Sequence, residues 1–190
     1  LSSQPYNMTA ETCFSGSTMP LKQDRAYRKF FQETLAQYSP AIMRVVTSYE
    51  RIKALQEELY QEISVALWKS LAKFDSQSSL KTYILSIAHK RAISHVAKYA
   101  KEPRSSEIVE YDLPQHDCPS STLAAQQRIS KLLNGLNQLS LVERQLVTLA
   151  LEGVSYLDIA EILGMTTNLV GVKLNRAKAK LKTIMENSDG

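Results

Sequence analysis

The chain has 190 residues, enough for one medium or two small domains with buried cores. Apolar residues make up 44% and charged residues 22%, which excludes an intrinsically disordered chain, and the net charge is only +4. The sequence has neither an apolar run of about eighteen residues nor a signal-peptide pattern at its start, so we expect a cytoplasmic protein without membrane insertion.

Residues 1–23 are polar and show no sustained period, so we interpret them as a loosely ordered N-terminal tail. From residue 24 to about residue 100, apolar residues recur at helical spacing in four successive stretches. The first stretch should end before Pro40, because proline lacks an N–H and restricts the residue before it. No alternating strand pattern occurs in this range, so residues 24–100 predict a small all-α domain. The residues that mark its helices are Tyr27, Phe30, Phe31, Leu35 and Tyr38; Ile42, Val45, Val46 and Tyr49; Leu55, Leu59, Ile63, Leu67 and Leu71; and Leu80, Tyr83, Ile84, Ile87 and Ala88.

A composition change separates this domain from the rest of the chain. Residues 101–121 contain three prolines, several acids and scattered serines, which predicts a flexible linker. Helical spacing restarts after it, so residues 122–190 predict a second small helical domain. Ser140 and Glu143 have the spacing of a capping box, and Gly153 should end the helix that they open. The expected buried positions are Ile129, Leu132, Leu133, Leu136, Val142, Leu146 and Leu149.

The last part of the second domain predicts a helix-turn-helix. Ser155 and Asp158 can cap one short helix, Gly164 interrupts the period, and Thr166 can cap a second helix. The second helix carries a run of basic residues, which suits it to lie against phosphates, although a solvated lysine face is the simpler alternative. The apolar stripes of the two helices are Tyr156, Ile159, Ala160 and Leu163, then Val170, Leu174, Ala177 and Leu181. The basic residues are Lys173, Arg176, Lys178, Lys180 and Lys182.

The first domain also carries charges of both signs on different helices. The third predicted helix has an acidic and polar patch beside its leucine stripe, whereas the fourth helix and its exit are basic. One face should repel nucleic acid and the other attract it, but two ordinary solvated faces would look the same. The acidic and polar patch consists of Glu57, Glu58, Gln61 and Glu62, and the basic set of Lys81, Lys90, Arg91, Lys98, Lys101 and Arg104.

Two stretches of this sequence resemble one protein family. Residues 55–96 are similar to the core-binding and −10-binding region of bacterial sigma factors of the extracytoplasmic-function (ECF, group IV) type. Residues 164–182 resemble the promoter −35 recognition segment of the same family, and the two motifs occur in the family's order. The matching residues in the first stretch are Glu58, Leu59, Gln61, Glu62, Ile63, Leu67, Trp68, Phe74, Ser79, Leu80, Thr82, Tyr83, Ile87, Ala88, Ala92 and Ile93. Those in the second are Val170, Leu174, Arg176, Ala177 and Leu181.

This resemblance implies a sigma factor that binds core RNA polymerase and directs it to promoter DNA without catalysing a reaction itself. It also implies an anti-sigma protein as a partner that the family often has. The core-polymerase-binding residues would be Glu58, Leu59, Gln61 and Glu62. The −10 DNA-binding residues would be Ser78, Ser79, Lys81, Tyr83, Lys90, Arg91 and His95. The −35 DNA-binding residues would be Thr167, Asn168, Leu169, Lys173, Arg176 and Lys180.

Three positions depart from the family pattern and leave the promoter sequence open. Lys90 stands where the family usually has Asn, and Tyr83 stands where Trp is commonest. Gly171 occupies a position that is often Lys or Arg, and glycine lowers helix propensity by roughly 1 kcal/mol relative to alanine.

Two other classes of protein have to be weighed against a sigma factor. A free-standing helix-turn-helix regulator would normally carry a dimerisation element or an effector pocket, and neither is recognisable. An enzyme acting on nucleic acid is less favoured, because His89, His95 and His116 have no Cys or acid cluster at metal-ligand spacing. We therefore predict no catalytic residue, no metal and no cofactor. Cys13 and Cys118 lie in irregular segments, and two free thiols are favoured over a disulfide.

Overall fold

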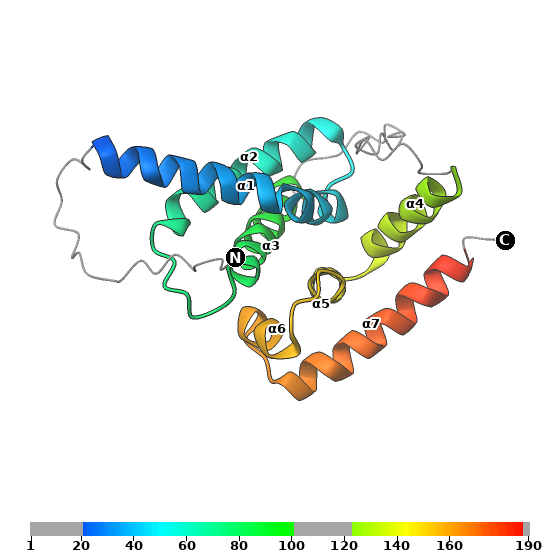
Figure 1. Cartoon of the computed structure of the whole chain (residues 1–190). Helices are drawn as coiled ribbons and strands as arrows, with labels where there is room; N and C mark the ends of the chain where they lie inside the picture. Colours follow the sequence, from blue (N-terminus) through cyan, green and yellow to red (C-terminus); the bar gives the residue numbers. More distant parts are fainter. Residues whose placement is uncertain (1–20, 101–122, 188–190) are drawn as a thin grey trace, which may run out of the picture.

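The computed structural model describes residues 21–100 and 123–187, and all regular structure in those two ranges is α-helical (Figure 1). This agrees with the predicted all-α fold. The helices are α1 (Leu21–Tyr49), α2 (Lys53–Leu71), α3 (Leu80–Tyr99), α4 (Leu123–Gln138), α5 (Leu141–Leu151), α6 (Tyr156–Leu163) and α7 (Thr167–Asn187). The predicted tail lies outside the described residues up to residue 20, and the predicted linker lies wholly outside them.

Helix α1 runs without interruption through Pro40, so the expected helix break before this proline is wrong. Buried residues continue on one face of the helix across the proline, at Thr34, then at Ala41, Ile42 and Val45. A proline inside a helix costs about 3 kcal/mol, whereas each buried aliphatic side chain contributes roughly 1.5–3 kcal/mol. Tertiary packing on both sides of Pro40 therefore outweighs the local preference.

Helices α1, α2 and α3 pack against one another and form the N-terminal unit. Its interior is filled by the leucine-rich stripe of α2 and the apolar residues of α1 and α3. Trp68 of α2 is held by α1, because its ring centroid lies 4.8 Å from that of Tyr27 and 4.9 Å from that of Phe31. The buried residues of α2 are Leu59, Ile63, Ala66, Leu67 and Leu71.

The C-terminal unit consists of α4, α5 and α6 packed on α7. Ser140 and Glu143 form the predicted reciprocal capping box at the start of α5. The Ser155 hydroxyl accepts a hydrogen bond from the backbone N–H of Asp158 at the start of α6. Gly164 ends α6 in the left-handed region, with φ 63°, which a residue without a Cβ adopts at low cost. Helices α6 and α7 thus form the predicted helix-turn-helix.

Three apolar side chains of this unit are more exposed than their spacing suggested. Ile129, Val142 and Tyr156 expose 47%, 45% and 46% of their surface. Val142 and Tyr156 lie in the first turn of α5 and α6, and Ile129 lies in the first half of α4. Further along the same three helices, Leu133, Leu146 and Ile159 lie in the core. Helical spacing identifies the apolar face correctly but does not show where the neighbouring helix stops covering it.

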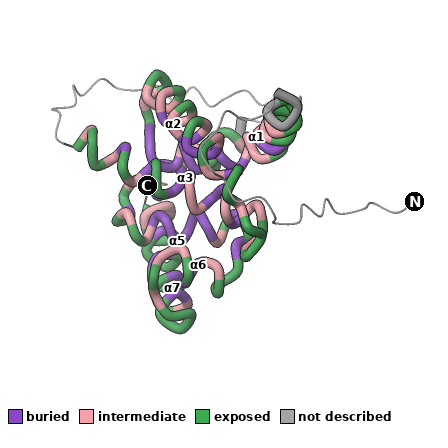
Figure 2. The backbone as a smooth tube through the Cα atoms, turned by 90° about the vertical axis from the view of Figure 1, so that its left-hand side faces the viewer, coloured by how far each residue is buried: buried purple, intermediate pink, exposed green. Residues whose placement is uncertain are grey.

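The two units are in contact with each other. Helix α5 packs against both α1 and α3, and α4 packs against α1. Buried residues gather at the centre of the molecule, where α3 and α5 meet (Figure 2). The helix-turn-helix is therefore held close to the N-terminal unit.

Candidate nucleic-acid interface

The polar face of α2 carries the predicted polymerase-binding residues. Gln61 is exposed, Glu58 and Glu62 are half-buried, and Glu57 beside them is exposed. Leu59 differs from the others because its side chain is fully buried in the core. In this structure Leu59 supports the helix from within and has no surface to offer a partner.

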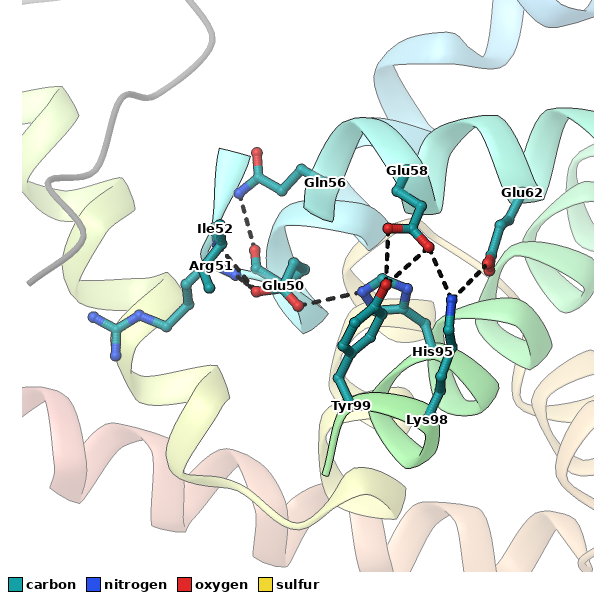
Figure 3. A network of polar contacts seen from close by, with 9 residues as sticks. All are labelled: Glu50, Arg51, Ile52, Gln56, Glu58, Glu62, His95, Lys98 and Tyr99. Atoms are coloured by element: carbon teal, nitrogen blue, oxygen red, sulfur yellow. Dashed lines mark hydrogen bonds and ion pairs between the residues drawn. The ribbon is translucent and has the colours of Figure 1, made fainter. Parts of the chain in front are cut away.

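The acidic residues of α2 are fixed by the last turn of α3 (Figure 3). Lys98 Nζ donates to Glu58 Oε1 at 2.9 Å and lies 3.9 Å from Glu62 Oε1. The Tyr99 hydroxyl donates to the Glu58 carboxylate, with distances of 2.9 and 2.8 Å to its two oxygens. Lys98 and then Tyr99 lower the pKa of Glu58, so this carboxylate is charged at neutral pH. The acidic patch is therefore held in a defined position before any partner arrives.

A second carboxylate, Glu50, lies beside this patch in Figure 3, next to His95, and is completely buried. Its Oε1 accepts hydrogen bonds from the backbone N–H groups of Arg51 at 2.7 Å and Ile52 at 3.0 Å. Its Oε2 lies 3.3 Å from His95 Nε2, and Gln56 donates to its backbone carbonyl at 2.9 Å. These contacts join the α1–α2 connection to α3. His95 was expected to face DNA, but its side chain is buried against Glu50 and is not on the surface.

Two exposed cations of α3 lie in the middle of the helix. Lys90 and Arg91 are both exposed and come from adjacent positions. Tyr83 is half-buried, because its hydroxyl donates to the backbone carbonyl of Ser70 at 3.0 Å and its ring lies 4.9 Å from that of Phe74. Tyr83 and Lys90 share one side of α3 about two turns apart, and aromatic rings together with cations are what single-stranded nucleic acids bind.

The short connection before α3 has a structural role as well. Ser79 caps α3, because its hydroxyl accepts from the backbone N–H of Thr82 at 3.0 Å. Ser78 is half-buried beside it, and Ser79 remains exposed on its other side. The two serines therefore lie at the positively polarised end of α3.

Lys81 faces the C-terminal unit. Its Nζ lies 3.7 Å from Glu152 Oε2 and also donates to the backbone carbonyl of Glu152. Arg44 of α1 binds the same carboxylate through two nitrogens, with Nε 2.5 Å from Oε1 and Nη2 3.0 Å from Oε2. The hydrogen bond to Glu152 raises the pKa of Arg44. Neither Arg44 nor Glu152 was identified from the sequence, because no local pattern marks an ion pair between residues so far apart.

Helix α7 exposes every residue that was predicted to contact the −35 element. Its buried stripe is the predicted one, Val170, Leu174, Ala177 and Leu181. At 100° per residue, the side directly opposite this stripe carries Asn168, Val172 and Ala179, with Asn175 and Arg176 at its two edges. Asn175 was missed in the sequence, although its i+7 spacing from Asn168 was available. Lys180 differs from the others because its Nζ donates to Glu143 Oε2 of α5 at 3.0 Å.

Among residues 21–100 and 123–187, no group of three or more His, Cys, Asp and Glu side chains could hold a metal ion. In the same ranges, no helix combines the length and apolar character needed to cross a membrane.

Comparison with known protein families identifies the family to which this chain belongs. Residues 34–102 match the family model "Sigma-70 region 2", and residues 129–181 match "Sigma-70, region 4". Relatives include the ECF RNA polymerase sigma factor SigK of Mycobacterium tuberculosis (strain H37Rv), which is 25% identical over 86% of this chain and 87% of its own length. The chain belongs to the ECF sigma-70 family.

Further relatives of this sigma factor cover it to a similar extent. RNA polymerase sigma factor NccH of Alcaligenes xylosoxydans xylosoxydans is 23% identical over 83% of this chain and 88% of its own. RNA polymerase sigma factor YlaC of Bacillus subtilis (strain 168) is 28% identical over 85% of this chain and 91% of its own. The sigma factor therefore directs promoter-specific initiation by core RNA polymerase and is not an enzyme. A free-standing regulator is no longer the alternative.

Solved structures share the fold of this sigma factor. The structure of CnrH in complex with the cytosolic domain of CnrY has a TM-score of 0.62 at 18% identity, covering 86% of this chain and 94% of CnrH. The sigma factor RpoE in complex with the anti-sigma factor NepR from Bartonella quintana has a TM-score of 0.66 at 24% identity, covering 83% and 98%. We use region 2 for α1–α3 and region 4 for α4–α7 below.

Proposed function

We propose that this sigma factor divides its tasks between three surfaces. The polar face of α2, with Glu58, Gln61 and Glu62, binds core RNA polymerase. The start and the exposed cations of α3 hold the −10 element, and the outward side of α7 reads the −35 element. In terms of the chain, residues 24–100 form the polymerase and −10 unit, 101–121 the linker and 122–190 the −35 unit. The separation between the acidic face of α2 and the exposed Lys90 and Arg91 of α3 is the observation that supports this division.

The polymerase surface is supported by the preorganised acids of α2. Because Lys98 and Tyr99 fix the Glu58 carboxylate, little side-chain freedom remains to be lost on binding. Gln61 is exposed beside it and can donate or accept hydrogen bonds at the edge of the same patch. A basic surface on the polymerase would complement this face.

The −10 surface is supported by the chemistry of α3. Opening a promoter exposes unstacked bases, whose flat faces bind aromatic rings and whose phosphates bind cations. Tyr83 with Phe74 supplies the rings, and Lys90 with Arg91 supplies the exposed cations. Ser78 and Ser79 add hydroxyl groups at the helix start, where anions are favoured.

The −35 surface is supported by the helix-turn-helix geometry. The N-terminal residues of a recognition helix contact base edges, whereas later residues meet the DNA backbone. Thr167, Asn168 and Leu169 occupy the exposed first turn of α7, and Lys173 and Arg176 follow. Lys180 would have to leave Glu143 to reach a phosphate.

The partners follow from these surfaces. We propose that the protein acts in the cytoplasm, because its promoters and the polymerase are there. We also propose an anti-sigma protein as a partner, by analogy with the Bartonella quintana structure, which was solved with one.

Transcription with purified core polymerase tests the proposal. A pool of templates with randomised upstream DNA should yield a defined set of initiating sequences when the sigma factor is added to core. The isolated sigma factor should give no transcript, and core alone should give no selection. The sequences recovered would provide a selected promoter for the measurements below. Failure to enrich any sequence with active core would contradict the proposed surfaces.

A further inference from the structure

The Glu152 carboxylate lies between two cations of region 2. Arg44 binds it through two nitrogens, and Lys81 approaches from α3. Only 8% of the Glu152 side chain is exposed, whereas Arg44 exposes 61% and Lys81 42%. The carboxylate is thus inserted into a site whose cationic walls remain open to solvent. A planar guanidinium paired with an ammonium is a common way to bind a phosphate oxygen.

Glu152 is well placed to connect the two regions. It is the C-cap residue of α5, immediately before the turn at Gly153 that leads to the helix-turn-helix. The contact is continued inside the molecule by His89 of α3, whose Nε2 lies 3.4 Å from Thr148 Oγ1. Region 4 therefore rests on region 2 through the buried Glu152 carboxylate, the Thr148–His89 contact and the Arg144 guanidinium over the Tyr49 ring, in addition to apolar packing.

This packed arrangement cannot serve both promoter elements at once. The −10 and −35 positions are about 25 base pairs apart, which is about 85 Å along B-form DNA. Helix α5 packs against both α3 and α7, and packed helices lie about 8–10 Å apart, so the axes of α3 and α7 are at most about 20 Å apart where both contact α5. Regions 2 and 4 have to separate before the proposed surfaces on α3 and α7 can each reach their element.

We propose that Glu152 is an internal mimic of a DNA phosphate, which keeps the free sigma factor closed by occupying a phosphate site made of Arg44 and Lys81. When the regions separate, the same two side chains bind a backbone phosphate of promoter DNA near the −10 element. The phosphate part rests on the proposed function, because it places DNA along α3. The closed state itself does not depend on it.

An ordinary structural ion pair makes a different prediction from a phosphate mimic. If the contact only holds the regions together, removing either partner has the same consequence. If Glu152 occupies a DNA site, removing Glu152 leaves the site intact, whereas removing Arg44 destroys it. The variants Glu152→Gln and Arg44→Ala should then behave alike in the free protein and differently on DNA.

The first experiment measures the closed state without DNA. Spin labels are placed on the exposed positions Ala97 of α3 and Thr183 of α7, with Cys13 and Cys118 replaced by serine, and their distance distribution is recorded. Both Glu152→Gln and Arg44→Ala should increase the long-distance population about tenfold, as expected for loss of a charge-assisted pair. Glu186→Gln, which removes an exposed acid near the far end of α7, is the charge-matched control and should not change it. An unchanged distribution in both test variants would overturn the closing role.

The second experiment measures holoenzyme on the selected promoter, with core in excess so that the regions are already apart. Arg44→Ala and Lys81→Ala should each weaken binding about tenfold and reduce the salt slope by about one unit. Glu152→Gln should bind at least as tightly as the parent, with the parent's salt slope. Equal losses for Glu152→Gln and Arg44→Ala, or no loss for either, would overturn the phosphate site. Parent holoenzyme that fails to bind promoter DNA would instead contradict the proposed function, and the label distances would still test the closed state.

Discussion

Tyr49 of α1 and His89 of α3 are joined in the interior, where Tyr49 Oη lies 3.0 Å from His89 Nδ1. The Thr148 hydroxyl of α5 donates to the carbonyl of Arg144 at 2.8 Å, so its oxygen is left to accept from His89 Nε2–H. His89 Nδ1 then accepts from the Tyr49 hydroxyl, and these roles require a neutral imidazole. Burial raises the pKa of Tyr49 and lowers the pKa of His89 to about 3, which keeps both groups uncharged.

This buried histidine predicts a pH-dependent stability. An unfolded histidine takes up a proton below a pH of about 6.5, whereas folded His89 stays neutral down to about pH 3. The unfolded state therefore binds more protons in this window, and the free energy of unfolding should fall as the pH is lowered from 6.5 towards 3, by up to about 1.4 kcal/mol per pH unit. Urea unfolding of the parent and of His89→Gln at pH 7 and pH 5 measures this change in the free energy of unfolding. If both proteins lose the same stability between pH 7 and pH 5, titratable groups other than His89 cause the pH dependence.

Neutralising the acidic face of α2 should weaken polymerase binding. Glu58→Gln combined with Glu62→Gln removes two charges without placing a cation against Lys98, which contacts both carboxylates. We expect roughly tenfold weaker binding to core polymerase with little change in fold, because an ion pair at the protein surface contributes only about 0–1 kcal/mol to stability. A labelled-core titration measures it. Glu33→Gln with Glu186→Gln, both exposed and remote in sequence, is the matched control. If the α2 variant binds core polymerase as tightly as the parent, this face of α2 is not part of the interface.

Removing the exposed cations of α3 should impair promoter opening more than polymerase binding. Lys90→Ala with Arg91→Ala removes two proposed phosphate contacts without disturbing the core, because both side chains are exposed. Permanganate reactivity of the melted strand should fall severalfold and the salt slope of promoter binding by about two units. Arg25→Ala with Lys29→Ala, exposed on α1, removes the same charge elsewhere. Normal promoter melting by the α3 variant would contradict the proposal that Lys90 and Arg91 bind the −10 element.

Two positions on α7 should separate base reading from phosphate binding. Asn168 lies in the first turn and Arg176 two turns later, and both are exposed. Asn168→Ala should change the preference for −35 sequences, by about 1–3 kcal/mol at one base pair if the amide makes a bidentate contact. Arg176→Ala should weaken all sequences similarly and lower the salt slope by about one unit. Binding of holoenzyme to single-base variants of the selected −35 element distinguishes the two roles. Identical, sequence-independent losses for both variants would show that Asn168 does not read the base sequence.

The same substitution at two glycines of the helix-turn-helix should have opposite effects on stability. Gly171 lies inside α7, and a Cβ there would meet only Tyr156 Cε2 at 3.8 Å, an ordinary contact. Gly171→Ala should stabilise the protein by about 0.5–1 kcal/mol through helix propensity. Gly164 has φ 63°, so Gly164→Ala should destabilise it by about 1–2 kcal/mol. Thermal unfolding measures both changes in stability. A destabilised Gly171→Ala would contradict the expectation that a Cβ fits at this position.

The features that sequence alone determined are local ones. The capping boxes and caps at Ser140 and Ser155, the turn at Gly164 and the buried stripe of α7 depend on residues within a few positions of one another. Helical hydrogen bonds and helix caps have the same short range, so the spacing of residue types is sufficient to predict them. The order of two motifs along the chain was likewise enough to indicate the family.

The tertiary structure decided what each polar side chain faces. The basic helix α3 has the same charge pattern whether His95 faces DNA or Glu50, and whether Lys81 faces DNA or Glu152. Continuity of α1 through Pro40 also depended on residues from α2 and α3, because only their packing outweighs the local cost of proline. The energy of a buried contact depends on which distant segment is brought against it, and Arg44 meets Glu152 across 108 residues. No pattern within one helix contains that information, because the partner lies in a different region of the fold.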